Sequence, residues 1–503
     1  KSGGVITNTG TIIVTATQSL INNPSGTYPQ TFNQNNGSLT IDGALTLNLS
    51  TFNYTGGTIT GTPLLYNSTL SFNGANPASF LMRGDSNLVG NISSGSTVRI
   101  QGGTAAAYVD AAGFTNAGTI ILETTSSATA RLNVTSPGTM TNTGTFKTEA
   151  GGGAGALNFN GDLNNQGTVT INKSLNLIKN GGVITNTGTI IVAASQSLIN
   201  NSPVTYPQTF NQNGGALNIG GSLNLYSSTF NYSGGTITGT PLLYTSTLSA
   251  TGANPASFLM RGSSGALTGD ISSGATVRIQ GGTATAYVNA AASFTNAGTI
   301  ILETTSSAVA QLTVTGTMTN TGTFKTEAGG GAGALNFNGD LNNQGTVTPN
   351  KSLSLMKSGG VVTNNGTITI PAGQSLRNNL PGVYPQTFNQ NGGTLDVTGT
   401  LTLVSSTFYF TGGTITGGGT INLSYSTFYG IGSMTANLNS TNSQLNPGLS
   451  PGILNITGNY TQTSGSLNVE ISGLNPGTSF DHLNVSGVAT LAGTLTVPFI
   501  NGY

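Results

Sequence analysis

The sequence predicts an all-β protein: a right-handed parallel β-helix (a β-solenoid) with about three strands and roughly 20–27 residues in each coil. Two of the observations that predict this fold are repeats in the sequence. A long repeat begins at Lys1, again at Lys179 and again at Lys357, and a shorter repeat runs inside each long one. The third is compositional, since only 5% of the residues are charged whereas 36% are hydrophobic and recur at short, regular intervals. This regular spacing of apolar residues predicts an ordered chain rather than a disordered one.

The long period is visible in the segment YPQTFNQN, which recurs with its phenylalanine at positions 32, 210 and 388. The first two copies agree nearly end to end, which indicates duplication, so identity between them does not mark functional residues. We divide the sequence into repeat unit 1, repeat unit 2, a partial repeat unit 3 and a divergent C-terminal segment, which span residues 1–178, 179–356, 357–434 and 435–503.

The short period consists of a turn of the form Asn-x-Gly-Thr followed by alternating apolar and polar residues, as in TNTGTIIV and MTNTGTFKT. The alternation predicts strands with one face on a narrow core and the other in water, and Gly and Asn tolerate the backbone conformations needed at the corners. One coil cannot bury its apolar face alone, so stacked coils should place like residues on like. We expect a stacked aromatic core from Phe32, Phe52, Phe210, Phe230, Phe388, Phe408 and Phe428.

Roughly 20 or more such coils, about 4.8 Å apart, would make a rod on the order of 100 Å long. The handedness follows from the usual chirality of parallel crossover connections.

The charge balance and the cysteine count exclude several classes of function. Thirteen basic residues balance thirteen acidic ones, so we expect no nucleic acid partner and no attraction to an anionic membrane. No apolar run reaches the roughly 18 residues of a membrane span. The chain has no Cys, which is typical of long exported bacterial proteins. Because its start lacks the features of a signal peptide, we expect that any export signal has been removed.

Some parallel β-helices are enzymes that act on polysaccharides, and such enzymes need clustered acids and bases. The single His, His482, follows Asp481; adjacent strand residues face opposite sides, so we expect this pair to be surface decoration. The other acids come singly, and no spacing places two carboxylates on adjacent coils at one corner. We therefore predict no catalytic residue, no cofactor and no metal site, and we expect Lys147 and Glu149 to form a surface ion pair.

Two patterns are typical of binding functions. The tripeptide Arg83, Gly84 and Asp85 is a candidate adhesion motif, although its counterpart in repeat unit 2 reads Arg-Gly-Ser, as expected of a coincidence. Thr-x-Thr triplets, such as the one that begins at Thr58, are typical of ice-binding solenoids. They recur only intermittently among Asn, Ser and Ala, as ordinary β-propensity would produce.

The C-terminal segment carries a series of short motifs: Ser-Pro-Gly from Ser450, Gly-Asn-Tyr from Gly458, Leu-Asn-Val-Glu from Leu467 and Asp-His-Leu-Asn-Val from Asp481. This series resembles the end of the passenger region in bacterial autotransporter-type surface proteins. The preceding repeats are similar in style to filamentous-haemagglutinin-like passenger repeats. The resemblance covers about a tenth of the chain; it implies a secreted or surface-anchored β-helical stalk and carries no catalytic residues to transfer.

The sequence thus predicts a non-enzymatic, bacterial extracellular or cell-surface β-solenoid that acts as an adhesin stalk or as a structural component of a matrix or filament. Its partners would be surface glycans or further copies of itself, through lateral or head-to-tail association. A polysaccharide-active enzyme and an ice-binding solenoid are the alternatives.

Overall fold

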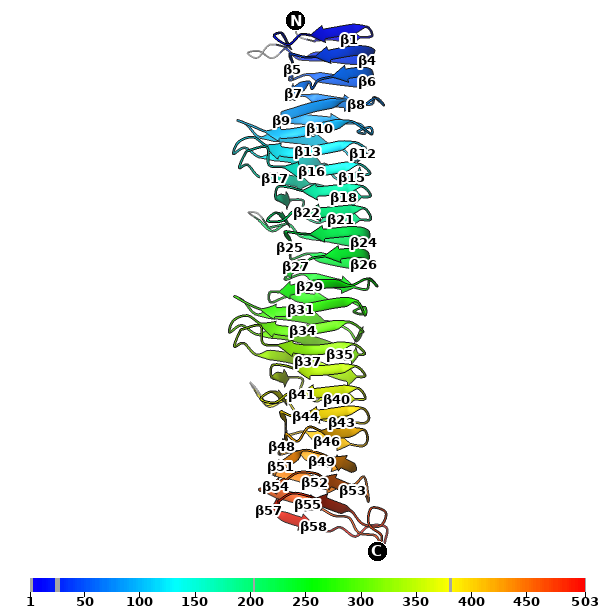
Figure 1. Cartoon of the computed structure of the whole chain (residues 1–503), viewed down its shortest axis with the longest axis vertical. Helices are drawn as coiled ribbons and strands as arrows, with labels where there is room; N and C mark the ends of the chain where they lie inside the picture. The colour runs from blue at the N-terminus through cyan, green and yellow to red at the C-terminus, as the bar shows by residue number, and fades with distance from the viewer. Residues whose placement is uncertain (1–2, 23–27, 202–203, 380–381, 503) are drawn as a thin grey trace. The chain divides into compact units, whose positions relative to one another are not determined.

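The computed structural model describes residues 3–22, 28–201, 204–379 and 382–502. In these residues the regular backbone structure is β-strand, without any α-helix (Figure 1). The strands pair in parallel with strands of the preceding and following coils. The predicted fold class is therefore confirmed as a β-solenoid of about 20 turns built from parallel stacked coils.

The coils group into two compact units, Lys1–Ser246 and Thr247–Tyr503, called the N-terminal and C-terminal units below. The division falls within repeat unit 2 of the sequence, so the compact units do not coincide with the long sequence repeats.

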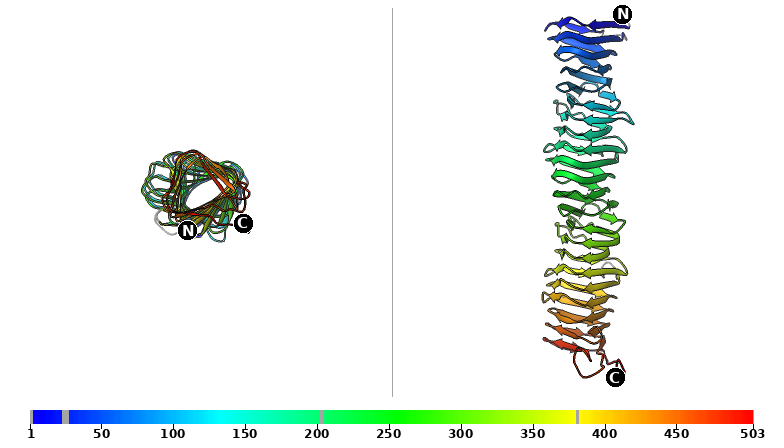
Figure 2. Two further views of the ribbon diagram at one scale, coloured as in Figure 1. Left: turned by 90° about the horizontal axis from the view of Figure 1, so that it is seen from below. Right: turned by 90° about the vertical axis from the view of Figure 1, so that its right-hand side faces the viewer.

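Each coil in the middle of the N-terminal unit contributes three strands. One coil comprises β13 (Thr119–Thr124), β14 (Ala130–Val134) and β15 (Thr139–Asn142). The next comprises β16 (Thr145–Glu149), β17 (Leu157–Asn160) and β18 (Asp162–Asn165). β13 pairs with β16, β14 with β17 and β15 with β18. These three ladders give the coils the three-sided outline seen end-on in Figure 2.

The coils vary in length more than the sequence predicts. A short coil occurs in the N-terminal unit, where β7 (Leu64–Tyr66) pairs with β9 (Ser79–Val89) so that Leu64 faces Leu81. A much longer one occurs in the C-terminal unit, where β53 (Ile453–Ile456) pairs with β56 (His482–Val485) so that Leu454 faces Leu483. The strands keep their register because the corner loops absorb the difference in length.

At one corner the chain bends without ending the strand. The short period predicts a turn at NQNNG, but this segment lies inside β4 (Gln30–Ile41). The corresponding corner of the next coil lies inside β6 (Thr51–Thr60), with register shifts between the two strands beside Asn35. Asn36 has a positive φ of 93° there, and a Cβ on Gly57 would lie 2.1 Å from the carbonyl oxygen of Gly37. The corner is thus a bulge in a continuous strand, which needs Gly because successive coils approach so closely.

The core of each unit contains the aromatic stacks. The rings of Phe32 and Phe52 lie parallel, with centroids 5.0 Å apart, and those of Phe210 and Phe230 repeat the arrangement at 5.1 Å. In the C-terminal unit, Phe408 makes edge-to-face contacts with Phe388 at 5.2 Å and with Phe428 at 5.0 Å. The structure buries all seven phenylalanines singled out from the sequence at 0% exposure.

Candidate functional site

A column of buried Asn side chains runs along one corner of each unit, and we call it the asparagine ladder. Each Asn side-chain amide donates to the Oδ1 or Oε1 atom of the next coil at 2.7–2.8 Å, and each column ends on a Gln. In the N-terminal unit the ladder comprises Asn116, Asn142, Asn165, Asn186 and Gln212, and in the C-terminal unit Asn296, Asn320, Asn343, Asn364 and Gln390. All ten side chains are fully buried, so each hydrogen bond replaces hydration lost on folding.

The ladder explains the Asn-x-Gly-Thr motif. Asn142 also donates to the carbonyl oxygen of Thr168 at 3.1 Å, which holds the corner of the next coil. A Cβ on Gly144 would lie 2.2 Å from the carbonyl oxygen of Gly118, and one on Gly167 equally close to that of Gly144. Asn therefore joins the coils, and Gly permits their close approach at the corner.

Threonines near the starts of successive strands form a continuous outward column in the C-terminal unit, although the Thr-x-Thr triplets themselves recur only intermittently. In-register pairs join seven successive coils of the C-terminal unit through Thr276, Thr299, Thr323, Thr346, Thr367, Thr394 and Thr414. The column beside it is mixed, because Ile301, Lys325 and Asp396 lie two residues further along their strands.

The N-terminal unit also carries a network of five charged side chains and one amide, which we call the charged ladder: Arg83, Arg99, Gln101, Glu123, Lys147 and Glu149. It crosses four successive coils on β9, β10 (Thr97–Gly102), β13 and β16. Arg83 donates to Gln101, Gln101 donates to Glu123, and Arg99 donates to Glu123 and, at 3.3 Å, to Glu149. The Glu123 side chain is only 6% exposed, so these donors take the place of water around its oxygens.

The C-terminal unit contains the same network, made of Arg261, Arg278, Gln280, Glu303, Lys325 and Glu327. Glu123 faces Glu149 in register, and Glu303 faces Glu327. The expectation that no spacing places two carboxylates on adjacent coils at one corner is therefore wrong. The pairing was missed because the chain between Glu123 and Glu149 includes corner loops whose length sequence alone does not reveal.

The outer end of each ladder is the ion pair expected from the sequence. The Lys147 Nζ atom lies 2.6 Å from Glu149, and that of Lys325 lies 2.7 Å from Glu327, which confirms this expectation. The hydrogen bond from Lys147, together with the charges of Lys147 and Arg99, lowers the pKa of Glu149; Lys325 and Arg278 do the same for Glu327. Both carboxyls are thereby held in their ionised form.

Loops that follow β10, β13 and β16 project beyond the sheets (Figure 1). Lys173 holds two of them together, since its Nζ atom donates to Thr124 Oγ1 at 2.6 Å and to the Gly153 carbonyl oxygen at 2.7 Å. Burial lowers the pKa of Lys173. The loop that contains Gly153 is rich in glycine and is held by the ammonium group of Lys173. In the described residues, no three His, Asp or Glu side chains cluster as metal ligands.

The candidate adhesion tripeptide lies within strand β9. Arg83 belongs to the charged ladder, Gly84 is buried with a φ of 66°, and the exposed Asp85 donates its backbone N–H to Asn67 Oδ1 at 2.8 Å. Its two charged side chains thus have different surroundings: one is tied to Gln101, and the other faces water.

Asp481 is not the surface residue expected from the sequence, because it is only 5% exposed. Its Oδ1 accepts a hydrogen bond from the backbone N–H of Gly452 at 2.8 Å, and its Oδ2 accepts one from the N–H of Glu470 at 2.9 Å. Burial is the main cause of a raised pKa for this carboxyl. Asp481 therefore joins the Ser-Pro-Gly turn and the Leu-Asn-Val-Glu strand, two of the motifs that occur together in the sequence.

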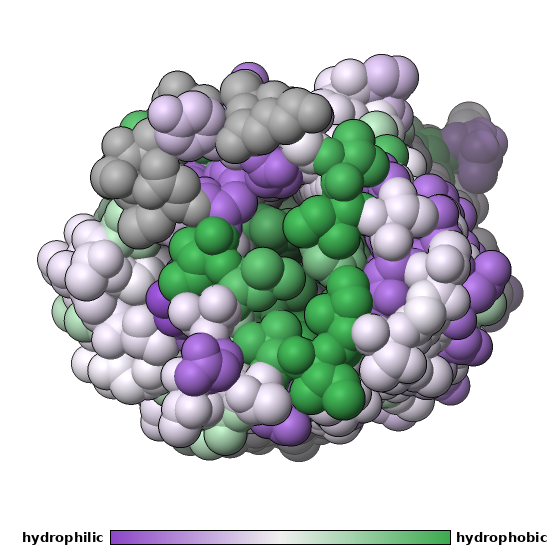
Figure 3. Space-filling view, turned by 90° about the horizontal axis from the view of Figure 1, so that it is seen from above, coloured by the Kyte–Doolittle hydropathy of each residue, from purple (hydrophilic) through white to green (hydrophobic). Residues whose placement is uncertain are grey.

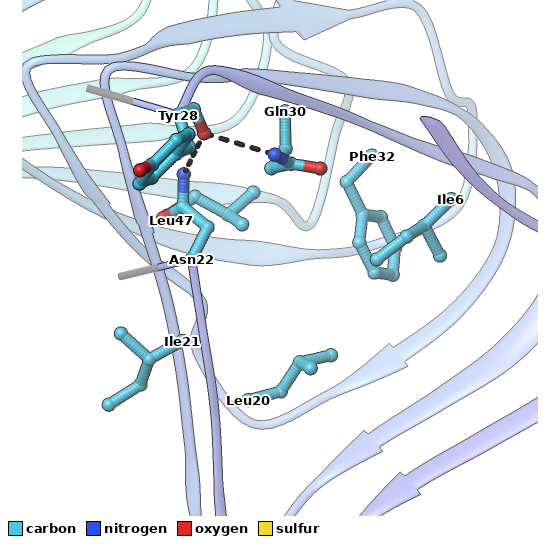
Figure 4. Close-up of a pocket in the computed structure, with 8 residues that line it drawn as sticks. All are labelled: Ile6, Leu20, Ile21, Asn22, Tyr28, Gln30, Phe32 and Leu47. Atoms are coloured by element: carbon cyan, nitrogen blue, oxygen red, sulfur yellow. Dashed lines mark hydrogen bonds between the residues drawn. The ribbon is translucent and has the colours of Figure 1, made fainter. Parts of the chain in front are cut away.

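At the first coil of the N-terminal unit, apolar side chains surround a hollow of about 400 Å³ (Figure 3). The first coil consists of β1 (Gly4–Asn8), β2 (Thr11–Val14) and β3 (Ser19–Ile21). Figure 4 shows Ile6 and Leu20 of this coil lining the hollow with Phe32, while Asn22 and Gln30 donate to the Tyr28 carbonyl oxygen at 3.5 Å and 3.0 Å.

Within the described residues, no helix has the length and apolar character needed to cross a bilayer. No family model, no curated protein and no solved structure matches this chain, so the repeats are assigned to a β-solenoid on their own geometry.

Proposed function

We propose that this chain is a non-enzymatic bacterial β-solenoid that works outside the cell, as an adhesin stalk or as a structural component of a matrix or filament. The asparagine ladder is the observation that carries the proposal. It ties each coil to the next by a buried hydrogen bond, for example from Asn142 to Asn165 at 2.8 Å. Since solenoid stability accumulates from such nearest-neighbour contacts, a long series of them suits a load-bearing element.

The state of the paired carboxylates supports a non-enzymatic role. Glycoside hydrolysis needs one carboxyl with a raised pKa to act as an acid. Arg99 and Lys147 instead lower the pKa of Glu149, and Glu123 accepts hydrogen bonds from Arg99 and Gln101. These contacts favour coil-to-coil bonding over proton transfer.

Composition and the C-terminal motifs support a place outside the cell. The chain is free of Cys and carries equal numbers of acidic and basic residues. The motifs joined by Asp481 resemble the end of autotransporter-type passenger regions, and we propose that this chain belongs to such a surface stalk.

The outward side chains favour glycans or further copies of the chain as partners. Asn53 donates to Asn33 at 2.8 Å in the N-terminal unit, and the rings of Tyr409 and Tyr429 stack 5.2 Å apart in the C-terminal unit. Amide and aromatic groups of this kind bind neutral sugar hydroxyls and ring faces without a charge requirement.

Single-molecule pulling on the full chain tests the mechanical role. We expect successive coil-by-coil ruptures, at forces that fall when Asn142 and Asn165 are both replaced by Ala. Replacing the outward Asn164 by Ala serves as the matched control. A chain that extends at low force, with no difference between these variants, would reject the stalk.

Ice binding is a second candidate, favoured by the continuous Thr column of the C-terminal unit. The charged side chains of Lys325 and Asp396 interrupt the neighbouring column, so we rank ice binding below the stalk. Thermal hysteresis of the full chain decides the matter: activity that disappears in T346A/T367A would establish ice binding, and no hysteresis would eliminate it.

A further inference from the structure

Among the described residues, the first coil leaves apolar side chains uncovered on the side away from the rest of the N-terminal unit. Ile6 is 36% exposed, and Ile12 and Leu20 are half-buried although their side chains point inward. We call these three side chains the first-coil face. Ile6 and Leu20 line the hollow seen in Figures 3 and 4.

The same residues recur later in the chain, where they are covered. The segment GGVITNTGTIIV is identical in the first and second repeats. The counterparts of Ile6, Ile12 and Leu20 in the second repeat are Ile184, Ile190 and Leu198, which are at most 3% exposed. In the third repeat, the corresponding residues Val362, Ile368 and Leu376 are equally buried.

Coils of near-identical sequence cover these counterparts in the second and the third repeat. Within the N-terminal unit, Leu163 lies on Ile184, Val169 on Ile190 and Leu175 on Leu198. Within the C-terminal unit, Leu341, Val347 and Leu353 cover the third-repeat residues in the same register. The covering segments belong to near-identical sequences, residues 157–177 and 335–355.

The covering coil also completes the polar corner. Asn186 accepts a hydrogen bond from Asn165 of the covering coil at 2.7 Å, and Asn364 accepts one from Asn343 at 2.8 Å. The first-coil counterpart, Asn8, accepts instead from the nearby N–H of Gly10 at 3.2 Å. Among the described residues, each strand of the first coil pairs along one edge: β1 and β2 pair with β4, and β3 pairs with β5 (Ala44–Asn48).

We propose that the first-coil face is a docking surface for one further coil of this same repeat, with inward residues in the register of Leu163, Asn165, Val169 and Leu175. This coil would fill the hollow, donate a side-chain amide hydrogen bond to Asn8 and pair with the edges of β1, β2 and β3 that face away from β4 and β5. The proposal concerns an interaction surface and holds whether or not the protein bears load.

Adding one coil to the N-terminal side of the first coil tests the proposal. Residues 157–178 are inserted directly before Lys1 of the full chain, which recreates the natural junction between Ile178 and Lys179. Hydrogen exchange of the amides from Gly4 to Ile21 is then followed by mass spectrometry. We expect their exchange to slow by about tenfold or more and to match that of residues 182–199 in the same molecule.

The control extension carries Asp in place of the leucines and valine that correspond to Leu163, Val169 and Leu175, and we expect it to leave the exchange of the first coil unchanged. Equal protection by the two extensions, or no protection by either, would overturn the proposal. If hydrogen exchange of the first coil in the unextended chain slows as the protein concentration rises, the occupant of the first-coil face is the end of a second molecule and not the proposed coil. Sedimentation velocity of the unextended chain would then detect that complex.

Discussion

Asn142 donates a hydrogen bond from its side-chain amide to Asn165 Oδ1 at 2.8 Å, between two coils whose corners are otherwise in contact through Gly. Neither side chain is exposed to water. The corner therefore has a polar interior, in which each amide needs the next coil to satisfy it.

Replacing Asn165 by Ala removes one member of this ladder. The Nδ2 atom of Asn142 and the Oδ1 atom of Asn186 both lose their side-chain partners, at a cost of about 1–3 kcal/mol. Hydrogen exchange in β18 and its neighbours should accelerate accordingly. Asn164→Ala, on the outward side of the same strand, is the control; equal acceleration in that variant would contradict the role of the ladder.

Replacing Phe408 by Ala removes the middle ring of the stack between Phe388 and Phe428. We expect a loss of about 3–5 kcal/mol in the C-terminal unit, because a fully buried ring leaves a cavity. Heat or denaturant unfolding followed by circular dichroism measures it. Tyr409→Ala, which removes the adjacent outward ring, should cost clearly less; the reverse order would show that the core does not depend on the stack.

Replacing Arg99 by Met leaves the Glu123 carboxylate buried with fewer donors. The expected loss is about 3–5 kcal/mol, because an unpaired buried charge is costly. Replacing Glu123 by Met as well should restore part of the loss. Unfolding of R99M and of R99M/E123M, compared at neutral pH, checks this, and a double variant no more stable than R99M would contradict it.

The charged ladders also predict a dependence on acid pH. The pKa of Glu149 and that of Glu327 are lowered from 4.5 in the folded protein. Each carboxyl therefore contributes stability fully above about pH 4.5, and loses it as the pH falls through the lower folded pKa. The effect is small because both side chains are partly exposed. A pH series of unfolding midpoints for E149Q/E327Q should be flatter below about pH 4.5 than that of the unchanged chain.

The raised pKa of Asp481 predicts a pH dependence of stability with the opposite sign. Its pKa is raised from 3.8, so its contribution is fully present below pH 3.8 and is lost as the pH rises through the folded pKa. Asp481→Asn should remove this dependence, while Asp481→Ala should loosen the segment that contains Gly452 and Glu470. Limited proteolysis of the C-terminal segment across this pH range distinguishes the variants. Identical cleavage of all three proteins would contradict the role of Asp481 in joining Gly452 and Glu470.

Particular residues show how far the sequence could predict the structure. Phe408 and Phe428 recur at an even, short spacing, and the structure brings their rings into edge-to-face contact, because no long loop intervenes between their strands. Glu123 and Glu149 are equally in register, but the longer loops between them hid the pairing. The Thr column was missed for the same reason, since its members are spaced unevenly along the chain.

By itself the sequence determined that the chain is a β-solenoid, because alternating apolar residues, corner glycines and a repeated period leave parallel stacking as the way to bury its core. It also indicated which phenylalanines point inward. Tertiary structure alone decided which groups meet between coils: the charged ladders, the hydrogen bond from Gly452 to Asp481 and the covering of Ile184 by Leu163. The physical reason is that hydrogen-bonded strands set the register, while corner loops of variable length decide how far apart in sequence two neighbours in space lie.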